Sequence, residues 1–244
     1  YITDYYFNFT SADGFRCGGH YGQPSVWKAG SKYAYCVELG VSVKNIINTT
    51  VSFTDDYKKL DSTERLNLRL ALTYGYRGTT RYGGSADEEY YATQIICWAI
   101  SEGVLDNTTK FNKLVNASLK GEISNKVKDK IKEIVGKIKK QINDHRTKPS
   151  FMADTKPDAT TYNLVYDENN NRYQRVFTDS KKVSDEYEFT SSNDDVKIET
   201  SQDGAKVTVY TKNASINTVT ITAERVKSEY LTKSQYTNVK GYYY

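Results

Sequence analysis

The amino-acid sequence predicts an α+β fold, in which a β-sandwich or barrel carries an inserted helical lobe. Residues 1–57 show the alternation and β-branched content of strands, and residues 58–146 show helical periodicity with capping signals. After the stretch 149–157, which begins and ends with a proline, the period returns to two. If the β parts 1–57 and 147–244 pair, the helical lobe 58–146 is an insertion and residues 1–244 form a single domain.

The first β part contains three stretches that we expect to form strands, at 1–9, 26–27 and 32–39. Alternation in the third stretch puts Cys36 on one face together with Ala34 and Glu38, whereas the opposite face carries Tyr33, Tyr35, Val37 and Leu39. The small or polar neighbours of Cys36 leave room for a second side chain to approach it. Residues 41–53 are β-branched and rich in Asn, which fits either a strand or a loop.

Capping signals mark two helices in the helical lobe. Asp61–Glu64 predicts one N-terminus and Ser85 with Glu88 predicts the other, and the two helices are expected to end at Gly75 and Gly103. In the second helix Gln94 shares a face with its i±3 and i±4 neighbours, which are Tyr90, Tyr91, Cys97 and Trp98. A glutamine among such bulky side chains is expected to be buried. A buried amide must find partners or have another task.

Two further helices are expected, at 110–119 and 122–142. The second of these has an apolar stripe and a lysine-rich face, a pattern that would also suit a membrane or nucleic-acid surface. Asp129 and Glu133 interrupt the run of positive charge. We therefore interpret the lysine-rich side as a solvated helix face.

The second β part is expected to contain six strands and a last strand that returns to the sheet, in the ranges 160–166, 172–177, 187–190, 196–200, 206–210, 218–226 and 234–244. Residues 167–171 mimic the start of a calcium-binding loop. Arg172 stands where such a loop needs Gly, and Thr178 stands where it needs Glu. We therefore interpret this stretch as a hairpin turn.

Composition limits the class of protein. The chain of 244 residues contains 22 tyrosines, which makes it too aromatic for a disordered chain. No apolar run approaches the ~20 residues of a membrane span. A net charge of +4 is too mild for a dedicated nucleic-acid binder. The ends show neither a signal peptide nor a sorting signal, so we expect a module of a longer protein.

The three cysteines and two histidines supply few metal ligands. Cys17 and His20 form a Cys-x-x-His pair in a Gly-rich loop, but a zinc site needs more ligands at suitable spacing. We therefore expect neither a metal nor a cofactor, and interpret the pair as part of a glycine turn. His20 is a candidate for assisting proton transfer at Cys36.

Two short motifs carry a resemblance to a known family. Tyr35-Cys36-Val37, followed downstream by Thr93-Gln94-x-x-x-Trp98, resembles the thioester domains of Gram-positive bacterial surface adhesins. The stretch Leu66–Gly78 resembles the segment that the family places between the two motifs. The chain departs from the family pattern at Arg77, where Pro is common, and at Ile96-Cys97, where Ala and Ile are expected. Neither departure removes a reacting atom.

The resemblance implies an intramolecular thioester, with Cys36 supplying the sulfur and Gln94 the acyl carbon. A thiolate that attacks a carboxamide expels ammonia and leaves an activated acyl group, which a lysine amine can then take. The bond would need shielding from water, for which the candidates are Tyr90, Tyr91 and Trp98. Cys97 lies one helical turn from Gln94, which leaves open which sulfur reacts. Cys17 and Cys97 are expected to stay free thiols.

The resemblance also implies a role. A thioester domain of this kind would be extracellular, on a wall-anchored stalk at the bacterial surface, and would attach covalently to a lysine of a host surface or matrix protein. A fibrinogen-like target is suggested by the family. The acyl group stays on the product, so such a module is used once and is not a turnover enzyme. We expect a monomer that neither inserts into a membrane nor binds nucleic acid.

Two other functions fit the residues. The first is a cysteine acyltransferase or peptidase, with Cys36 as nucleophile and His20 or His145 as base. The second is a non-covalent binding module of β-sandwich type that uses exposed tyrosines as contacts. The intact mass of the protein distinguishes the enzyme from the thioester module. Target binding by a Cys36→Ala variant distinguishes the non-covalent module from it.

Overall fold

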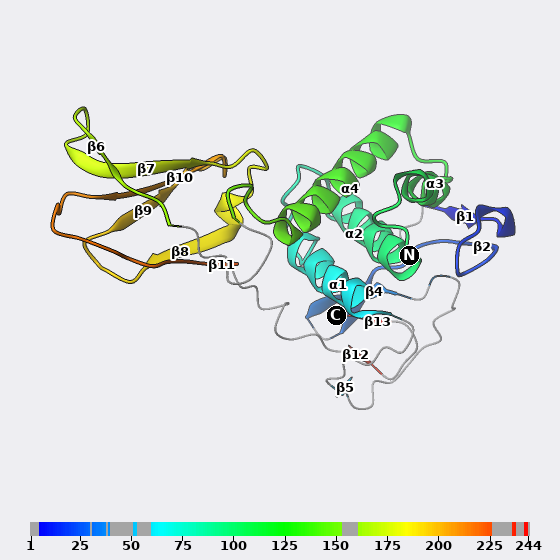
Figure 1. Ribbon diagram of the computed structural model, residues 1–244. Helices are drawn as coiled ribbons and strands as arrows, with labels where there is room; N and C mark the ends of the chain where they lie inside the picture. The colour runs from blue at the N-terminus through cyan, green and yellow to red at the C-terminus, as the bar shows by residue number, and fades with distance from the viewer. Residues whose placement is uncertain are drawn as a thin grey trace. The chain divides into compact units, whose positions relative to one another are not determined.

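The computed structural model of the protein describes residues 5–29, 31–37, 39, 51–52, 60–152, 161–225, 236–237 and 242–243. Within these residues it has four α-helices and several small antiparallel sheets (Figure 1), which confirms the predicted α+β class. The chain divides into two compact units. The first contains Tyr1–Ile142 and Ser228–Tyr244, and the second contains Asn143–Lys227. That residues 1–244 act as one domain stays a prediction.

The four helices are α1 (Ser62–Tyr74), α2 (Ala86–Ser101), α3 (Thr108–Ser118) and α4 (Asn125–Arg146). Both predicted capping boxes are present, because Asp61 and Ser85 accept hydrogen bonds from the backbone N–H groups of Glu64 and Glu88. The helix after Ser85 therefore begins at the predicted place.

Helix α2 forms the centre of the first unit. Every residue from Glu89 to Ser101 is buried, which is the pattern of a helix enclosed on all sides. Helices α1 and α3 pack against it, as does a strand of the N-terminal segment (Figure 1). A buried helix of this kind can place a polar side chain in the core only where that side chain has a hydrogen-bond partner.

The strands of the first unit form two sheets. Strands β1 (Phe7–Phe9) and β2 (His20–Gly22) make a hairpin. The larger sheet has the order β3-β4-β13-β12-β5, with the bounds Trp27–Ala29, Lys32–Cys36, Tyr242–Tyr243, Tyr236–Thr237 and Val51–Ser52. Strand β13 pairs with β4, so the predicted return of the C-terminal tail to the sheet is confirmed. Most of the ambiguous stretch 41–53 lies outside the described residues.

The second unit consists of two sheets. One has the order β6-β7-β10-β9 and the other pairs β8 with β11. The six strands span Val165–Asp167, Arg172–Thr178, Tyr187–Ser191, Lys197–Thr200, Lys206–Thr211 and Ile221–Arg225, in the order β6 to β11. Phe151 contacts Phe177 of β7 and Phe189 of β8, and so joins the two sheets.

The stretch that mimics a calcium loop is a β-hairpin. Strands β6 and β7 pair antiparallel, and the Asp167 carboxylate accepts hydrogen bonds from the backbone N–H groups of Asn169 and Asn170 in the turn. Asn171 adopts the left-handed conformation, with φ of 46°. The Asp167 carboxylate is thus hydrogen-bonded within the hairpin itself.

Pairing between the predicted β parts is made by β12 and β13, which join the N-terminal strands. Strands β6 to β11 pair with one another instead. Among the described residues, no helix has the length and apolar character needed to cross a membrane.

Candidate functional site

The structure brings the side chain of Gln94 to the backbone of Cys36, although 58 residues separate them in the chain. The Gln94 Oε1 atom accepts a hydrogen bond from the Cys36 N–H at 2.8 Å, and Gln94 Nε2 donates one to the Cys36 carbonyl oxygen at 2.7 Å. Gln94 is 2% exposed, and Cys36 is partly exposed. The oxygen and the nitrogen of the Gln94 carboxamide are therefore both hydrogen-bonded to the backbone of Cys36.

The position of Cys36 in the sheet explains this arrangement. Strand β3 pairs with β4 only as far as Trp27 opposite Ala34, so Cys36 lies beyond the end of β3. Pro24, which lacks an N–H, is buried in the segment that precedes β3. The Gln94 carboxamide bonds the N–H and C=O groups of Cys36 as a neighbouring strand would. The buried amide and the strand edge thereby satisfy each other.

The same geometry suits acyl transfer at the carboxamide carbon. A nucleophile that adds to this carbon would place negative charge on Oε1, and the Cys36 N–H already donates to that atom. A fixed donor aimed at a developing oxyanion lowers the barrier of such a reaction. Cys36, the residue that provides this donor, also carries the candidate thiol.

Cys97 differs from Cys36 in its surroundings. Its side chain is fully buried, and this burial, with a smaller effect of Cys36, raises the pKa of the Cys97 thiol well above its usual range. A thiol that resists ionisation is a poor nucleophile. The comparison favours Cys36 as the reacting sulfur.

Cys17 lies in the loop before β2. Its backbone N–H donates to Glu102 Oε2 at 3.2 Å. Burial and the nearby Glu102 carboxylate raise the pKa of the Cys17 thiol to about 12. Cys17 is half-buried and Cys97 is buried, and neither forms a disulfide in the described part of the chain.

Of the three candidate shielding residues, Tyr90 faces the strand that carries Cys36. Its ring stacks on Tyr35 with centroids 4.8 Å apart, and its hydroxyl donates to the Ala34 carbonyl oxygen at 2.7 Å. Tyr91 instead donates to the Ser118 carbonyl oxygen and stacks on Tyr5.

Trp98 joins an aromatic cluster in the core of the first unit. Its ring contacts those of Phe7, Phe9 and Tyr91. Tyr90 therefore contacts β4, whereas the contacts described for Tyr91 and Trp98 lie on other parts of the first unit.

The two histidines make other contacts. The His20 ring, in β2, lies against Phe7 with centroids 5.6 Å apart. His145 is 5% exposed, and its Nδ1 lies 3.6 Å from Glu186 Oε2 in the second unit. Neither of these contacts involves Cys36 or Gln94.

The segment that leads into α2 is held by Glu89, which the sequence did not single out, and by Thr93 of the second motif. The fully buried carboxylate of Glu89 accepts hydrogen bonds from the backbone N–H groups of Arg81, Tyr82 and Gly84. Thr93 Oγ1 accepts a hydrogen bond from the Tyr76 N–H at 2.9 Å. A glutamate within an apolar helix was the available signal, because a buried carboxylate requires donors.

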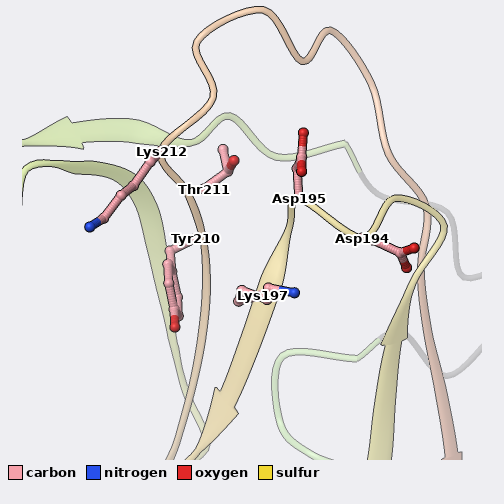
Figure 2. Close-up of a pocket in the computed structure, with 6 residues that line it drawn as sticks. All are labelled: Asp194, Asp195, Lys197, Tyr210, Thr211 and Lys212. Carbon is pink, nitrogen blue, oxygen red and sulfur yellow. The ribbon is translucent and has the colours of Figure 1, made fainter.

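A separate hollow of about 320 Å³ lies in the second unit, lined by Asp194, Asp195, Lys197, Tyr210, Thr211 and Lys212. Figure 2 shows that the charged ends of these side chains spread apart and do not converge on one point. Asp195 and Tyr210 are bonded to Asn213 and Glu199. Within the part of the chain that the structure describes, no group of three metal-ligand side chains is found.

Comparison with known proteins relates the central part of the chain to one family. The thioester domain family model matches residues 33–144, a range that includes both Cys36 and Gln94. No curated protein matches the chain. Among solved structures, the thioester domain of the Staphylococcus aureus TIE protein is similar, with 15% identity, a TM-score of 0.48, and coverage of 87% of this chain and 76% of that one. Residues 33–144 of this chain therefore match the thioester domain family.

Proposed function

We propose that the protein is a surface adhesin module that attaches covalently to an amine through an internal thioester between Cys36 and Gln94. The observation that carries the proposal is the pair of hydrogen bonds between the Gln94 carboxamide and the Cys36 backbone. These bonds hold the acyl carbon beside the residue that bears the thiol. Fixing two reactants in this way can supply about 7–11 kcal/mol of the activation barrier.

In the first step the Cys36 thiolate adds to the Gln94 carbonyl carbon. The Sγ–C bond forms, the C–Nε2 bond breaks, and the nitrogen leaves as ammonia after taking up the thiol proton. The Cys36 N–H stabilises the charge on Oε1 during the addition. The product is a thioester, which is an activated acyl group.

In the second step a primary amine of the target adds to the same carbon. The C–S bond breaks, Cys36 recovers its proton as a free thiol, and the Gln94 acyl group becomes an amide of the target. The partly exposed position of Cys36 provides access for the amine, while the buried Tyr90 covers the strand beneath. The acyl group stays on the target, so the reaction occurs once per chain.

The family resemblance supports a proposal for the partner and the location. We propose that the amine is a lysine of a host surface or matrix protein, with a fibrinogen-like protein as one target to try. The module would act as a monomer outside the cell, on a Gram-positive surface to whose wall the full-length protein is anchored. We also propose that the two units of residues 1–244 act together as one thioester domain.

Intact mass before and after methylamine tests the proposal. The protein is expected to weigh one ammonia less than its sequence requires, and methylamine should add to Gln94 with release of a free Cys36 thiol. Cys36→Ala and Gln94→Ala should each show the full mass and no adduct.

Two outcomes would contradict the thioester. A full mass together with turnover that His20→Ala or His145→Ala abolishes would indicate a cysteine enzyme. Target binding that is equally reversible in the wild type and in Cys36→Ala would indicate a non-covalent binding module.

A further inference from the structure

The hydroxyl of Tyr90 occupies the point where β3 and β4 separate. It accepts a hydrogen bond from the Trp27 N–H at 3.1 Å and donates its one proton to the Ala34 carbonyl oxygen at 2.7 Å, with the Ser25 carbonyl oxygen as a second acceptor within reach at 3.2 Å. Trp27 and Ala34 are the last paired residues of the two strands before Cys36. A side chain from α2 thus lies between backbone groups of both strands.

Tyr90 and Gln94 form hydrogen bonds to β4 at two points, and the spacing of these points along the strand matches the spacing of the two residues along the helix. Four residues along a helix rise ~6 Å, and two residues along a strand rise ~6.7 Å. Tyr90 bonds Ala34 and Gln94 bonds Cys36, so a step of four in α2 meets a step of two in β4. The helix therefore follows the strand in one register, with increasing residue number in the same direction.

We propose that Tyr90 is the positioning residue that sets the register of α2 on β4 and so brings the Gln94 carboxamide to Cys36. The inference rests on the proposed thioester chemistry and assigns Tyr90 a role beyond shielding. A slip of one residue along α2 would move Gln94 by ~1.5 Å. Misplacements of about 1 Å can cost a reaction a hundredfold in rate.

The ring and the hydroxyl of Tyr90 contribute differently. The ring stacks on Tyr35 and is almost fully buried, so it fills space whether or not the oxygen is present. Within the Tyr90 side chain, it is the hydroxyl oxygen that forms hydrogen bonds to the backbone of β3 and β4. Tyr90→Phe keeps the ring and removes these hydrogen bonds, which isolates the register from the packing.

Tyr91→Phe is the matched control. Tyr91 is the next residue of the same helix and is also fully buried, but its hydroxyl donates to Ser118 in α3 and not to β4. Both substitutions remove one buried tyrosine hydroxyl, so both should lower the melting temperature, and Tyr90→Phe should lower it more because the hydrogen bond from the Trp27 N–H is also lost. Only Tyr90→Phe should affect the formation of the thioester.

The experiment follows thioester formation from the open state. Ammonia added to the unfolded chain restores the Gln94 carboxamide and the Cys36 thiol, and after refolding the loss of ammonia is followed by intact mass. We expect Tyr90→Phe to form the thioester at least tenfold more slowly than the wild type, and Tyr91→Phe to form it at the wild-type rate. Rates are taken on the monomeric, folded fraction of each protein.

Equal rates in the wild type and in Tyr90→Phe would overturn the inference, as would an equal loss of rate in both phenylalanine variants. If Tyr90→Phe folds incompletely, sucrose restores the folded population without restoring the hydroxyl. The slow rate should then persist, and a return to the wild-type rate would count against the inference. A wild type that never loses ammonia would contradict the thioester itself, which is a different result.

Discussion

Cys36 and Cys97 carry the same functional group but differ in burial, and this difference decides their expected reactivity. Cys36 is partly exposed and its backbone holds the Gln94 carboxamide. Cys97 is fully buried one turn further along α2, where burial raises the pKa of its thiol. The nucleophile must ionise, so the buried thiol is disfavoured even though it shares a helix with Gln94.

Cys97→Ala should keep the mass deficit of one ammonia and the methylamine adduct. The substitution removes a buried sulfur, so the free energy of unfolding should fall by about 1–2 kcal/mol. Intact mass and thermal melting measure the two effects on one sample. Cys36→Ala serves as the comparison, since it should lose the deficit. A Cys97→Ala protein of full mass would show that Cys97 supplies the sulfur.

At the residue scale the sequence singled out the two side chains that we propose to react, but not the groups that hold them. Cys36 and Gln94 stand in motifs that can be recognised by residue type. The partners of Tyr90 are backbone atoms of Trp27, Ser25 and Ala34, and backbone atoms leave no mark in a sequence. Such contacts depend on where a helix lies over a sheet, which is known only once the chain has folded.

At the scale of elements, the approach of α1 to α2 depends on Gly75. A Cβ atom built on Gly75 would lie 2.5 Å from the Ala71 carbonyl oxygen and would also overlap the side chain of Thr93. Thr93 precedes Gln94 and accepts a hydrogen bond from Tyr76. Gly75 was expected from the sequence to end α1, and the close approach to α2 is an additional reason for glycine at this position.

Gly75→Ala should therefore lower the free energy of unfolding by roughly 1–3 kcal/mol, because it overpacks the contact between the two helices. It should also reduce the fraction of chains that show the mass deficit, since Thr93 must move and Gln94 is its neighbour. Denaturant melting and intact mass report the two effects.

Gly136→Ala is the control for this change. Nothing lies within 4 Å of a Cβ at Gly136, inside α4. This substitution should stabilise the protein by about 0.5–1 kcal/mol, because alanine favours a helix more than glycine does. Equal stability of the two alanine variants would show that α1 and α2 can separate at little cost.

The elements themselves were largely predictable, since caps, helical periodicity and strand alternation are local signals. The start of α2 after Ser85 and the hairpin at Asp167 were both expected from residue type. The end of β4 at Cys36 was not, because the predicted strand ran to Leu39. Alternation describes which side chains share a face, but it does not show where a neighbouring strand stops.

On the scale of the whole molecule, the C-terminal tail belongs to the first unit although the second unit precedes it in the chain. Residues Ser228–Tyr244 return to the first unit, and Tyr242 of β13 is paired with Cys36 of β4. Strand β4 is thus held by β13 on one side, and by β3 and the side chains of α2 on the other. The sequence predicted a returning strand but could not choose its neighbour, because pairing between distant strands is a property of the whole fold.

A chain that ends after Lys227 should lose both its cooperative melting in the first unit and its mass deficit. Removal of β13 would leave the edge of β4 unpaired, and each lost backbone hydrogen bond costs about 0.5–1.5 kcal/mol. It would also free the strand that presents Cys36 to Gln94. A synthetic peptide of residues 228–244, added in excess, should bind the shortened chain and restore part of the deficit, measured by intact mass. A shortened chain that melts as the full chain does and still lacks one ammonia would show that β3 and α2 alone hold Cys36 in place.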